Sequence, residues 1–324
     1  MAALESTIHI ISPELTLLND KIRERLSTSN PLMNQVIESF LRNKGKQLRP
    51  IILLLTAKMF GDINDSAIAA ASAVELLHNA SLIHDDVVDN SMMRRNSPSI
   101  NAVWDNHIAV LIGDFFVSTA MQQAISTGNV DIIDSLCMLG RTLSIGELDQ
   151  IYNARFHQIS EEAYFNIIYN KTASLFVTCA RMGCHSAGVV GDDLEAMTRF
   201  AGLLGLCFQL RDDIFDYFSD EKVGKPTGND LKEGKITLPL LYALSDSSNP
   251  EHNKMKELSM KPELTDTEIR TLINFAIDNG GIEYTYRKMG ELRDEAAGIL
   301  ASLPAGDARD AMLVVLDSII TRDH

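Results

Sequence analysis

The sequence predicts an all-α protein built as a bundle of helices. Residues 66–89, 161–188 and 193–218 form long segments rich in helix-forming residues, and the first of them has no glycine or proline to stop a helix. Strand-like alternation of apolar and polar residues is rare, and no Asn-Gly or Asp-Gly turn joins two β-branched runs. Both observations favour helices over sheets along the chain.

Clusters of turn residues separate the predicted helices. In chain order they read FGDINDS, RRNSPS, STGNVD, VVGDDL, DNGG and LPAGDA. They predict roughly ten or more helices with short connections. Because no linker rich in Pro, Ser and Gly divides the chain, we predict that residues 1–324 form a single domain.

One predicted loop, residues 219–235, differs in composition from the others. It reads SDEKVGKPTGNDLKEGK and holds three glycines, one proline and four lysines. A segment of this kind beside a site for anions is typical of a lid, so we expect it to close over the site.

Composition and charge limit the classes of function. The 324 residues carry a net charge of −15, which argues against a nucleic-acid-binding protein. Anionic substrates remain compatible where local cations or metals offset the field. The four cysteines, at positions 137, 179, 184 and 207, form no CxxC pair and lie in apolar segments, so we expect buried, reduced thiols and a cytoplasmic location.

The chain start and the apolar stretches give no sign of membrane insertion. The first ten residues lack the basic region and apolar core of a signal peptide. The runs IILLLTA and AIAAASAVELL are far shorter than the ~20 residues of a membrane span. We therefore predict no transmembrane segment and expect any membrane contact to be peripheral.

Two apolar helical segments each contain three aspartates at positions i, i+1 and i+4. They are Asp85, Asp86 and Asp89 in LIHDDVVD, and Asp212, Asp213 and Asp216 in LRDDIFD. Residues at i and i+4 lie on one face of a helix, where like charges destabilise it by roughly a few tenths of a kcal/mol. Burial without partners costs several kcal/mol more, roughly. A solvated acidic face would explain one cluster, but two matching clusters indicate a shared cation.

Mg²⁺ suits this pattern because it binds one or two carboxylates per ion and fills its other positions with waters and phosphate oxygens. The clusters lie 127 positions apart (212 − 85), so they can face each other only across a bundle of helices. We therefore predict a polar site over an apolar cavity, with a metal-bound diphosphate between the clusters.

A diphosphate site needs further cations, and the sequence supplies them near the two clusters. They are Lys46, Arg49, Arg94, Arg95, Lys171, Lys225 and Lys235, with Thr172 beside Lys171. His78 precedes Asp85 by seven residues and so projects from a similar face of the same helix. Alone it would be taken for a core histidine, but beside these cations we interpret it as a ligand of diphosphate.

These motifs together resemble those of the trans-prenyl diphosphate synthases, or polyprenyl synthetases. The matching segments are LIHDDVVDNSMMRRNSPS, GELDQ, NKTASLF, FQLRDDIFDY and GKPTGNDLKEGKITLPLLYAL, and they span about residues 40–245. The resemblance implies the isoprenoid synthase type of fold, an all-α bundle around a deep central cavity, in a homodimer.

The resemblance also implies a role for each site residue. The six aspartates would hold about three Mg²⁺ ions. Lys171 would also act in catalysis, by stabilising the departing diphosphate. The allylic diphosphate, farnesyl or shorter, would bind to Arg94, Lys171, Thr172, Gln209, Lys225 and Lys235. Isopentenyl diphosphate would bind in a metal-free second site, to Lys46, Arg49, His78 and Arg95.

Three positions depart from the family pattern. Lys44 replaces a frequent glycine, Gln47 replaces a common basic residue, and Asn96 replaces a usual glycine. Asn tolerates the left-handed conformation better than most residues, so the turn can survive. Because none of these changes removes a group that contacts metal or substrate, we expect an active enzyme.

The expected reaction is chain elongation. Metal ions and lysines stabilise the departing diphosphate, the allylic fragment becomes carbocation-like, and the double bond of isopentenyl diphosphate attacks it. A proton then leaves, and because no side chain is an obvious base, the released diphosphate is the expected acceptor. Closure of the lysine-rich loop would exclude water.

Product length should depend on the helix that bears Asp85, which rises about 5.4 Å per turn, close to one isoprenyl unit. Ala80 and Ser81 lie one turn before Asp85 and form the first gate. Family members that stop at farnesyl length often have an aromatic residue there, so small residues predict a long-chain product of about six to ten units, suited to a quinone side chain.

The floor of the tunnel should lie deeper. Candidates are Leu77 and Val74 on the same helix and Phe115, Phe116 and Met121 on the facing helix, with simple core packing as the equal alternative for each.

Other functions stay open at this point. The nearest are a short-chain (farnesyl or geranylgeranyl) diphosphate synthase and a class I terpene cyclase, although a cyclase needs no second diphosphate site. A ferritin-like di-metal protein needs two Glu-x-x-His motifs, and only the one at residues 75–78 is found. A non-catalytic partner subunit would not need the complete set of aspartates and cations.

Overall fold

The computed structural model describes residues 7–42, 45–94, 97–156, 160–218 and 227–321. The prediction of an all-α fold is confirmed, because helices make up nearly all of the described structure. The longer helices are α2 (Ser12–Leu26), α4 (Leu48–Phe60), α5 (Asp65–Val88), α7 (Asn106–Ser126), α8 (Val130–Phe156), α10 (Ser174–Ser186), α11 (Asp192–Asp216), α16 (Gly281–Ala301) and α17 (Asp307–Ile320).

Shorter elements connect the long helices. They are η1 (Ile8–Ile11), α3 (Pro31–Arg42), α6 (Ile100–Val103), α9 (Glu161–Ile168), η2 (Tyr169–Ala173), α12 (Asn229–Lys232), α13 (Leu238–Ala243), α14 (His252–Ser259) and α15 (Asp266–Asp278). Within the described residues the only strands are β1 (Met93–Arg94) and β2 (Ser97–Pro98), which pair antiparallel with Arg94 opposite Ser97.

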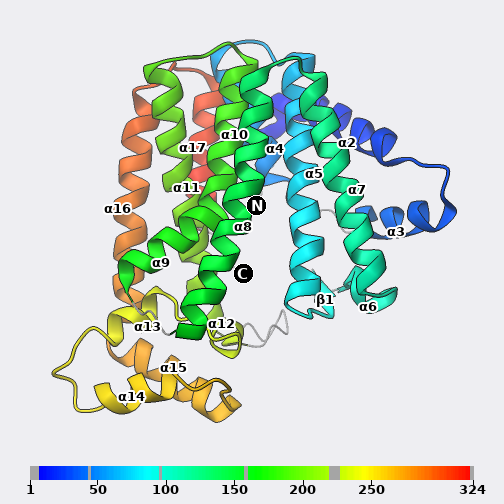
Figure 1. Ribbon diagram of the computed structural model, residues 1–324. Helices are drawn as coiled ribbons and strands as arrows, with labels where there is room; N and C mark the ends of the chain where they lie inside the picture. The colour runs from blue at the N-terminus through cyan, green and yellow to red at the C-terminus, as the bar shows by residue number, and fades with distance from the viewer. Residues whose placement is uncertain (1–6, 43–44, 95–96, 157–159, 219–226, 322–324) are drawn as a thin grey trace.

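The long helices stand side by side, and α5, α8 and α11 all end at the lower end of the bundle in Figure 1. There β1, α12 and α13 lie near their ends, and α14 and α15 form a small group below. The main apolar core joins buried residues of α2, α4, α5, α7, α8, α10, α11 and α17. The aspartate clusters therefore lie on rigid helices, at the same end of the bundle.

Helix α5 is shaped by its sequence at both ends. The side chain of Asn64 accepts a hydrogen bond from the backbone N–H of Ala67, which caps the first turn. Ala, Leu and Ile residues then bury the middle of the helix in the core. The helix ends at Val88 with Asp89 as its C-cap, so the first aspartate cluster occupies its last turn and its C-cap.

The segment predicted as one helix over residues 161–188 contains a local distortion. α9 and α10 are joined through η2, a π-helical turn at Tyr169–Ala173. Such turns widen a helix by one residue and occur frequently at functional sites. This turn holds Lys171 and Thr172, two of the predicted diphosphate ligands.

The described part of the loop predicted over residues 219–235 is partly helical, which corrects that prediction. The carboxylate of Asp216 accepts hydrogen bonds from the backbone N–H groups of Asn229 (3.1 Å) and Asp230 (3.0 Å). It thereby satisfies the first free donors of α12 and fixes where this helix begins. Residues 219–226 lie outside the described residues.

One other expectation needs correction. Cys137 is exposed, whereas the other three cysteines are buried as predicted, and all four are free thiols.

By length and composition alone, α5 and α7 could cross a membrane, although no single apolar run is that long. Inside the protein, 83% of the apolar window of α5 is buried, as in a core helix, whereas 44% of that of α7 is buried.

Candidate active site

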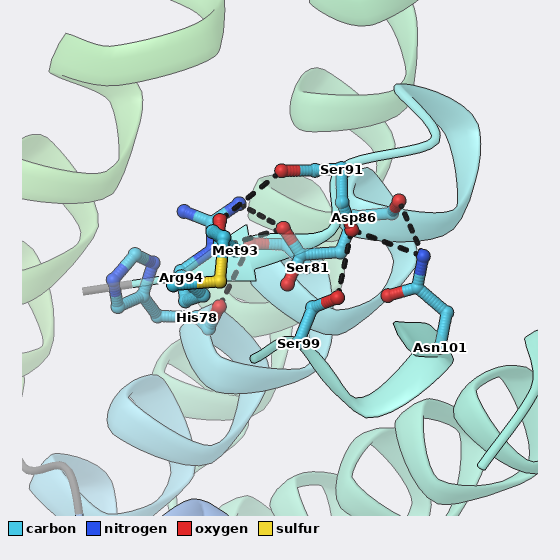
Figure 2. A network of polar contacts seen from close by, with 8 residues as sticks. All are labelled: His78, Ser81, Asp86, Ser91, Met93, Arg94, Ser99 and Asn101. Atoms are coloured by element: carbon cyan, nitrogen blue, oxygen red, sulfur yellow. Dashed lines mark hydrogen bonds and ion pairs between the residues drawn. The ribbon is translucent and has the colours of Figure 1, made fainter. Parts of the chain in front are cut away.

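The first aspartate cluster is tied to the β hairpin by an ion pair (Figure 2). The Oδ1 atom of Asp86 accepts hydrogen bonds from Nε (3.0 Å) and Nη2 (2.6 Å) of Arg94. Asp86 is only 4% exposed, so the guanidinium compensates a buried charge. Arg94 thus lies beside the cluster, as predicted, and one oxygen of Asp86 is already engaged.

Hydrogen bonds from side chains to backbone carbonyl groups hold the end of α5 and the hairpin together. Nδ2 of Asn101 donates to the carbonyl oxygens of Asp86 (3.2 Å) and Ser91 (3.1 Å). Oγ of Ser99 also donates to the carbonyl oxygen of Ser91, at 2.7 Å. These bonds satisfy carbonyl groups that a helix end leaves free, and they fix the turn that carries Asp85 and Asp89.

Asp85 and Asp89 face the helices on the other side of the bundle. Burial raises the pKa of Asp85 to about 6; the charge of Lys171 opposes this rise, and that of Glu147 adds to it. Burial also raises the pKa of Asp89, against the opposing charge of Lys235. Both carboxylates therefore lack full compensation from the protein and lie within electrostatic reach of predicted diphosphate ligands.

Lys171 is held by polar groups of α8. Its Nζ atom lies 2.5 Å from Oε2 of Glu147 and 3.3 Å from Oε1 of Gln150. Glu147 and Gln150 belong to the segment GELDQ, one of the segments that carry the family resemblance. The contacts orient Lys171 toward the space between the two aspartate clusters.

A chain of hydrogen bonds organises the second cluster. Oγ1 of Thr172 donates to Oε1 of Gln209 (2.7 Å), and Nε2 of Gln209 donates to Oδ1 of Asp213 (2.7 Å). The hydroxyl of Tyr164 donates to the other oxygen of Asp213, at 2.5 Å. Burial and the charge of Asp230 raise the pKa of Asp213, while these hydrogen bonds oppose the rise. The chain joins η2, α9 and α11 at the site.

The other aspartates of the second cluster have different surroundings. Asp212 is exposed, and Asp216 caps α12 as described above. Burial raises the pKa of Asp230 to about 6, and the charge of Asp216 adds to that rise. Lys235 forms an ion pair with Glu233 and contributes to the field at Asp230 and Asp89.

A pocket brings these groups together between α8, α9, η2, α11 and α13. Five of the predicted site residues line it: Lys171, Thr172, Gln209, Asp213 and Lys235. Ile167, Ile168, Ile236 and Leu241 form its apolar walls. The arrangement is a polar site with cations, carboxylates and an adjoining apolar surface, which suits an amphiphilic anion.

Two of the residues predicted for isopentenyl diphosphate lie on helices, Arg49 on α4 and His78 on α5. Arg49 lies in the first turn of α4 with its guanidinium 5.7 Å from the ring centre of Phe176. His78 is buried on α5, and Lys46 is exposed just before α4. Gln47, one of the departures, exchanges amide hydrogen bonds with Asn19. Arg95 and Lys225 lie outside the described residues.

The chain-length candidates lie where α5 packs against α7. Gly113 contacts the ring of His84, since a Cβ atom there would lie 2.2 Å from Nε2 of that ring. The two helices run in opposite directions (Figure 1), so Phe116, three residues after Gly113, lies at the level of Ser81, three residues before His84. Phe116 is fully buried, as is Ala80.

The residues predicted for the floor of the tunnel differ in how far they are buried. Val74 is fully buried, whereas Leu77 and Phe115 are partly buried and pack against the core. Met121 is 48% exposed, so its side chain lies on the outer face of α7, in contrast to its predicted place in the floor.

Comparison with known proteins decides the family. The Polyprenyl synthetase family model matches residues 30–276. The chain belongs to the polyprenyl synthetase family. It is a trans-prenyltransferase of that family, whose members use a divalent metal with diphosphate substrates.

Full-length relatives agree with this assignment. Octaprenyl diphosphate synthase of Escherichia coli (strain K12) is 32% identical, with 99% of each chain covered. A polyprenyl synthase from Caulobacter crescentus, solved with calcium and isoprenyl diphosphate, has a TM-score of 0.92 at 32% identity, covering 99% and 98% of the two chains. Geranylgeranyl pyrophosphate synthase from Bacteroides thetaiotaomicron has a TM-score of 0.85 at 36% identity, covering 99% and 100%.

The polyprenyl synthetase site fits a divalent metal held jointly by carboxylates and substrate. Its oxygen donors are of the kind that Mg²⁺ prefers, and burial raises the pKa of Asp85 and Asp89, a cost that a bound cation would remove. Within the described residues, no three His, Cys, Asp or Glu side chains form a ready-made metal cluster. Oxygen atoms of diphosphate and water are the further ligands that such an ion would take.

Sequence reasoning missed four polar residues of this polyprenyl synthetase site. They are Glu147, Gln150, Tyr164 and Asp230, which contact or adjoin predicted ligands. GELDQ was the only signal for the first two. Nothing in the sequence pointed to Tyr164, because its contact with Asp213 joins positions 49 apart.

Proposed function

We propose that this polyprenyl synthetase condenses an allylic diphosphate with successive isopentenyl diphosphates to a long-chain all-trans polyprenyl diphosphate. The observation that carries the proposal is the meeting of two aspartate clusters with Lys171 and Lys235 at one end of an apolar bundle. The proposal treats residues 1–324 as one catalytic domain and takes a respiratory quinone as the destination of the product.

Roles follow from the positions of the groups. About three Mg²⁺ ions, held by the aspartates of both clusters, would supply positive charge to the allylic diphosphate and ease its departure. Lys171 and Thr172 hold the same diphosphate from η2, and Lys235 holds it from the segment between α12 and α13. Tyr164 and Gln209 orient Asp213 through its two oxygens. Arg49 and His78 hold isopentenyl diphosphate on the α4 and α5 side.

Incorporation of isopentenyl diphosphate tests the reaction. With farnesyl diphosphate and labelled isopentenyl diphosphate, we expect incorporation that requires Mg²⁺, stops with excess EDTA and returns when Mg²⁺ is restored. A cyclic hydrocarbon formed without incorporation would instead favour the terpene cyclase alternative.

A long product is favoured by the gate residues, and a short product is the second candidate. Ala80 is small and fully buried on α5, and Ser81 lies at the level of Phe116. The Escherichia coli relative is named for an octaprenyl product, which supports a long product. The Bacteroides thetaiotaomicron structure is named for geranylgeranyl, a shorter product. The large, buried ring of Phe116 near the gate is the observation that favours the shorter product.

Replacing Ala80 with Phe is expected to shorten the product to about three or four isoprenyl units, because the ring would fill the space one helical turn below Asp85. Chromatographic sizing of the dephosphorylated products measures the change. Ala69→Phe, on the same helix four turns from Asp85 and also buried, provides a control for general disruption. Identical products from wild type and Ala80→Phe would refute the gate assignment.

We further propose a homodimer that joins the outer faces of α7 and α8. Leu111, Met121 and Ile125 on α7 and Ile145 and Leu148 on α8 are exposed apolar side chains at helical spacing. Exposed apolar side chains grouped on neighbouring helices are typical of interfaces between subunits.

Replacing Ile125 and Leu148 with Asp together is expected to reduce the mass in solution from two chains of 35.8 kDa to one. Sedimentation equilibrium measures this mass. Val190→Asp, an exposed apolar residue on the loop between α10 and α11, should leave it unchanged. A dimer that survives the double change would place the interface elsewhere.

A further inference from the structure

A second pocket adjoins the first aspartate cluster on the side of α3. It lies between the end of α3, the last turns of α5, the β hairpin and α6. Its charged residues are Arg42, Asp86 and Arg94, and Ser39, Ser97 and Ser99 add hydroxyl groups to its wall. Arg94 and Asp86 are the pair drawn in Figure 2, so the pocket borders the candidate active site directly.

The charges in this pocket do not balance. Its one carboxylate, Asp86, is already paired through Oδ1 with both Nε and Nη2 of Arg94. The guanidinium of Arg42 makes no hydrogen bond or ion pair with another described residue, although the chain has 44 acidic residues against 29 basic ones. Two guanidinium groups and one carboxylate leave one positive charge on the pocket, which favours an anion.

The pocket also lies on the side of α5 where the second substrate is expected. His78, Leu82 and Asp86 follow at four-residue intervals and therefore form one stripe along α5. Leu82 and Asp86 line the pocket, and His78 lies one turn further along the same stripe. Arg42 thus approaches, from α3, an anion that is bound near His78.

We propose that Arg42 is a substrate-binding residue that contacts the diphosphate of isopentenyl diphosphate from the α3 side. The proposal rests on the proposed function and assigns to the second substrate a cation that no motif identified. A guanidinium can donate two hydrogen bonds to one phosphate group, which gives it a role that a neutral side chain cannot fill.

A purely structural role for Arg42 is the rival explanation. Arg42 ends α3, and a cation in the last turn stabilises a helix through its free carbonyl groups. That role predicts a lower melting temperature when the charge is removed, with no change in substrate affinity. The two explanations therefore differ in a binding measurement.

The test measures the dissociation constant of isopentenyl diphosphate in the absence of divalent metal for wild type, Arg42→Gln, Arg42→Lys and Arg23→Gln. Arg23 lines a shallow groove with Arg42 but does not line the pocket at Asp86, so it is the matched control. We expect Arg42→Gln to bind about tenfold more weakly, Arg42→Lys to recover part of the loss, and Arg23→Gln to match wild type.

Steady-state kinetics give a second readout. We expect Arg42→Gln to raise KM for isopentenyl diphosphate by a similar factor and to leave KM for farnesyl diphosphate unchanged. Wild-type affinity in a folded Arg42→Gln variant, with or without a lower melting temperature, would overturn the assignment of Arg42 alone. A wild-type protein that neither binds nor incorporates isopentenyl diphosphate would overturn the proposed function together with it.

Discussion

Replacing Asp85 with Asn is expected to lower kcat/KM by about 10³-fold or more, the largest effect that we predict for one side chain. Asp85 lies in the last turn of α5, and burial raises the pKa of its carboxyl group to about 6. Such a carboxylate binds a cation strongly because the protein compensates its charge only in part. Asn keeps the shape and loses the charge.

The measurement is the rate of isopentenyl incorporation at saturating Mg²⁺, with circular dichroism as a check on folding. Asp62→Asn is the matched control, because its side chain is fully exposed just before α5. We expect the control to stay within about twofold of wild type. Retention of more than a tenth of wild-type activity by Asp85→Asn would contradict the role of this carboxylate in metal binding.

Replacing Lys171 with Met is expected to lower kcat by about 10²- to 10³-fold, because it removes a fixed positive charge from the departing diphosphate. The π-helical turn and the contacts with Glu147 and Gln150 place this ammonium group between the clusters. Met retains the length and the apolar stem of the side chain.

Two further variants separate catalysis from folding in this experiment. Glu147→Gln breaks the same ion pair and keeps Lys171, so a smaller loss than that of Lys171→Met is expected. Lys58→Met removes an exposed lysine on α4 and should behave as wild type. If Glu147→Gln and Lys171→Met lose equal activity, the ion pair is structural and the proposed role of Lys171 is wrong.

The long helices were predictable because their signals are local. The run over α5 has strong helix formers and no breaker, and α11 starts after Gly191, whose φ of 67° lies in the left-handed region that favours glycine. The two aspartate clusters were predictable for the same reason, since i and i+4 share a face on any helix.

Features that depend on contacts across the fold were not predictable. The start of α12 depends on the carboxylate of Asp216, thirteen positions before Asn229. The π-helical turn at Lys171 has no pattern of its own in a segment that reads as one helix. Tyr164 binds Asp213 only because α9 packs beside α11.

The ion pair of Asp86 with Arg94 shows most clearly what could not be predicted from the sequence. Spacing assigned Asp86 to metal and Arg94 to diphosphate, because each residue type suits that ligand. The structure brings the two side chains within 2.6 Å of each other at a buried position. The pairing of Asp86 with Arg94 depends on the positions of the hairpin and of Asn101, and no local sequence pattern specifies these positions.

Sizing the products of the wild-type enzyme tests the central claim most directly. Purified protein would be incubated with Mg²⁺, farnesyl diphosphate and labelled isopentenyl diphosphate, and the dephosphorylated chains separated by length. We predict a ladder that ends at about six to ten isoprenyl units, because small residues line the gate one turn below Asp85. A stop at three or four units would contradict the open gate at Ala80 and Ser81, and no incorporation of label would contradict elongation itself.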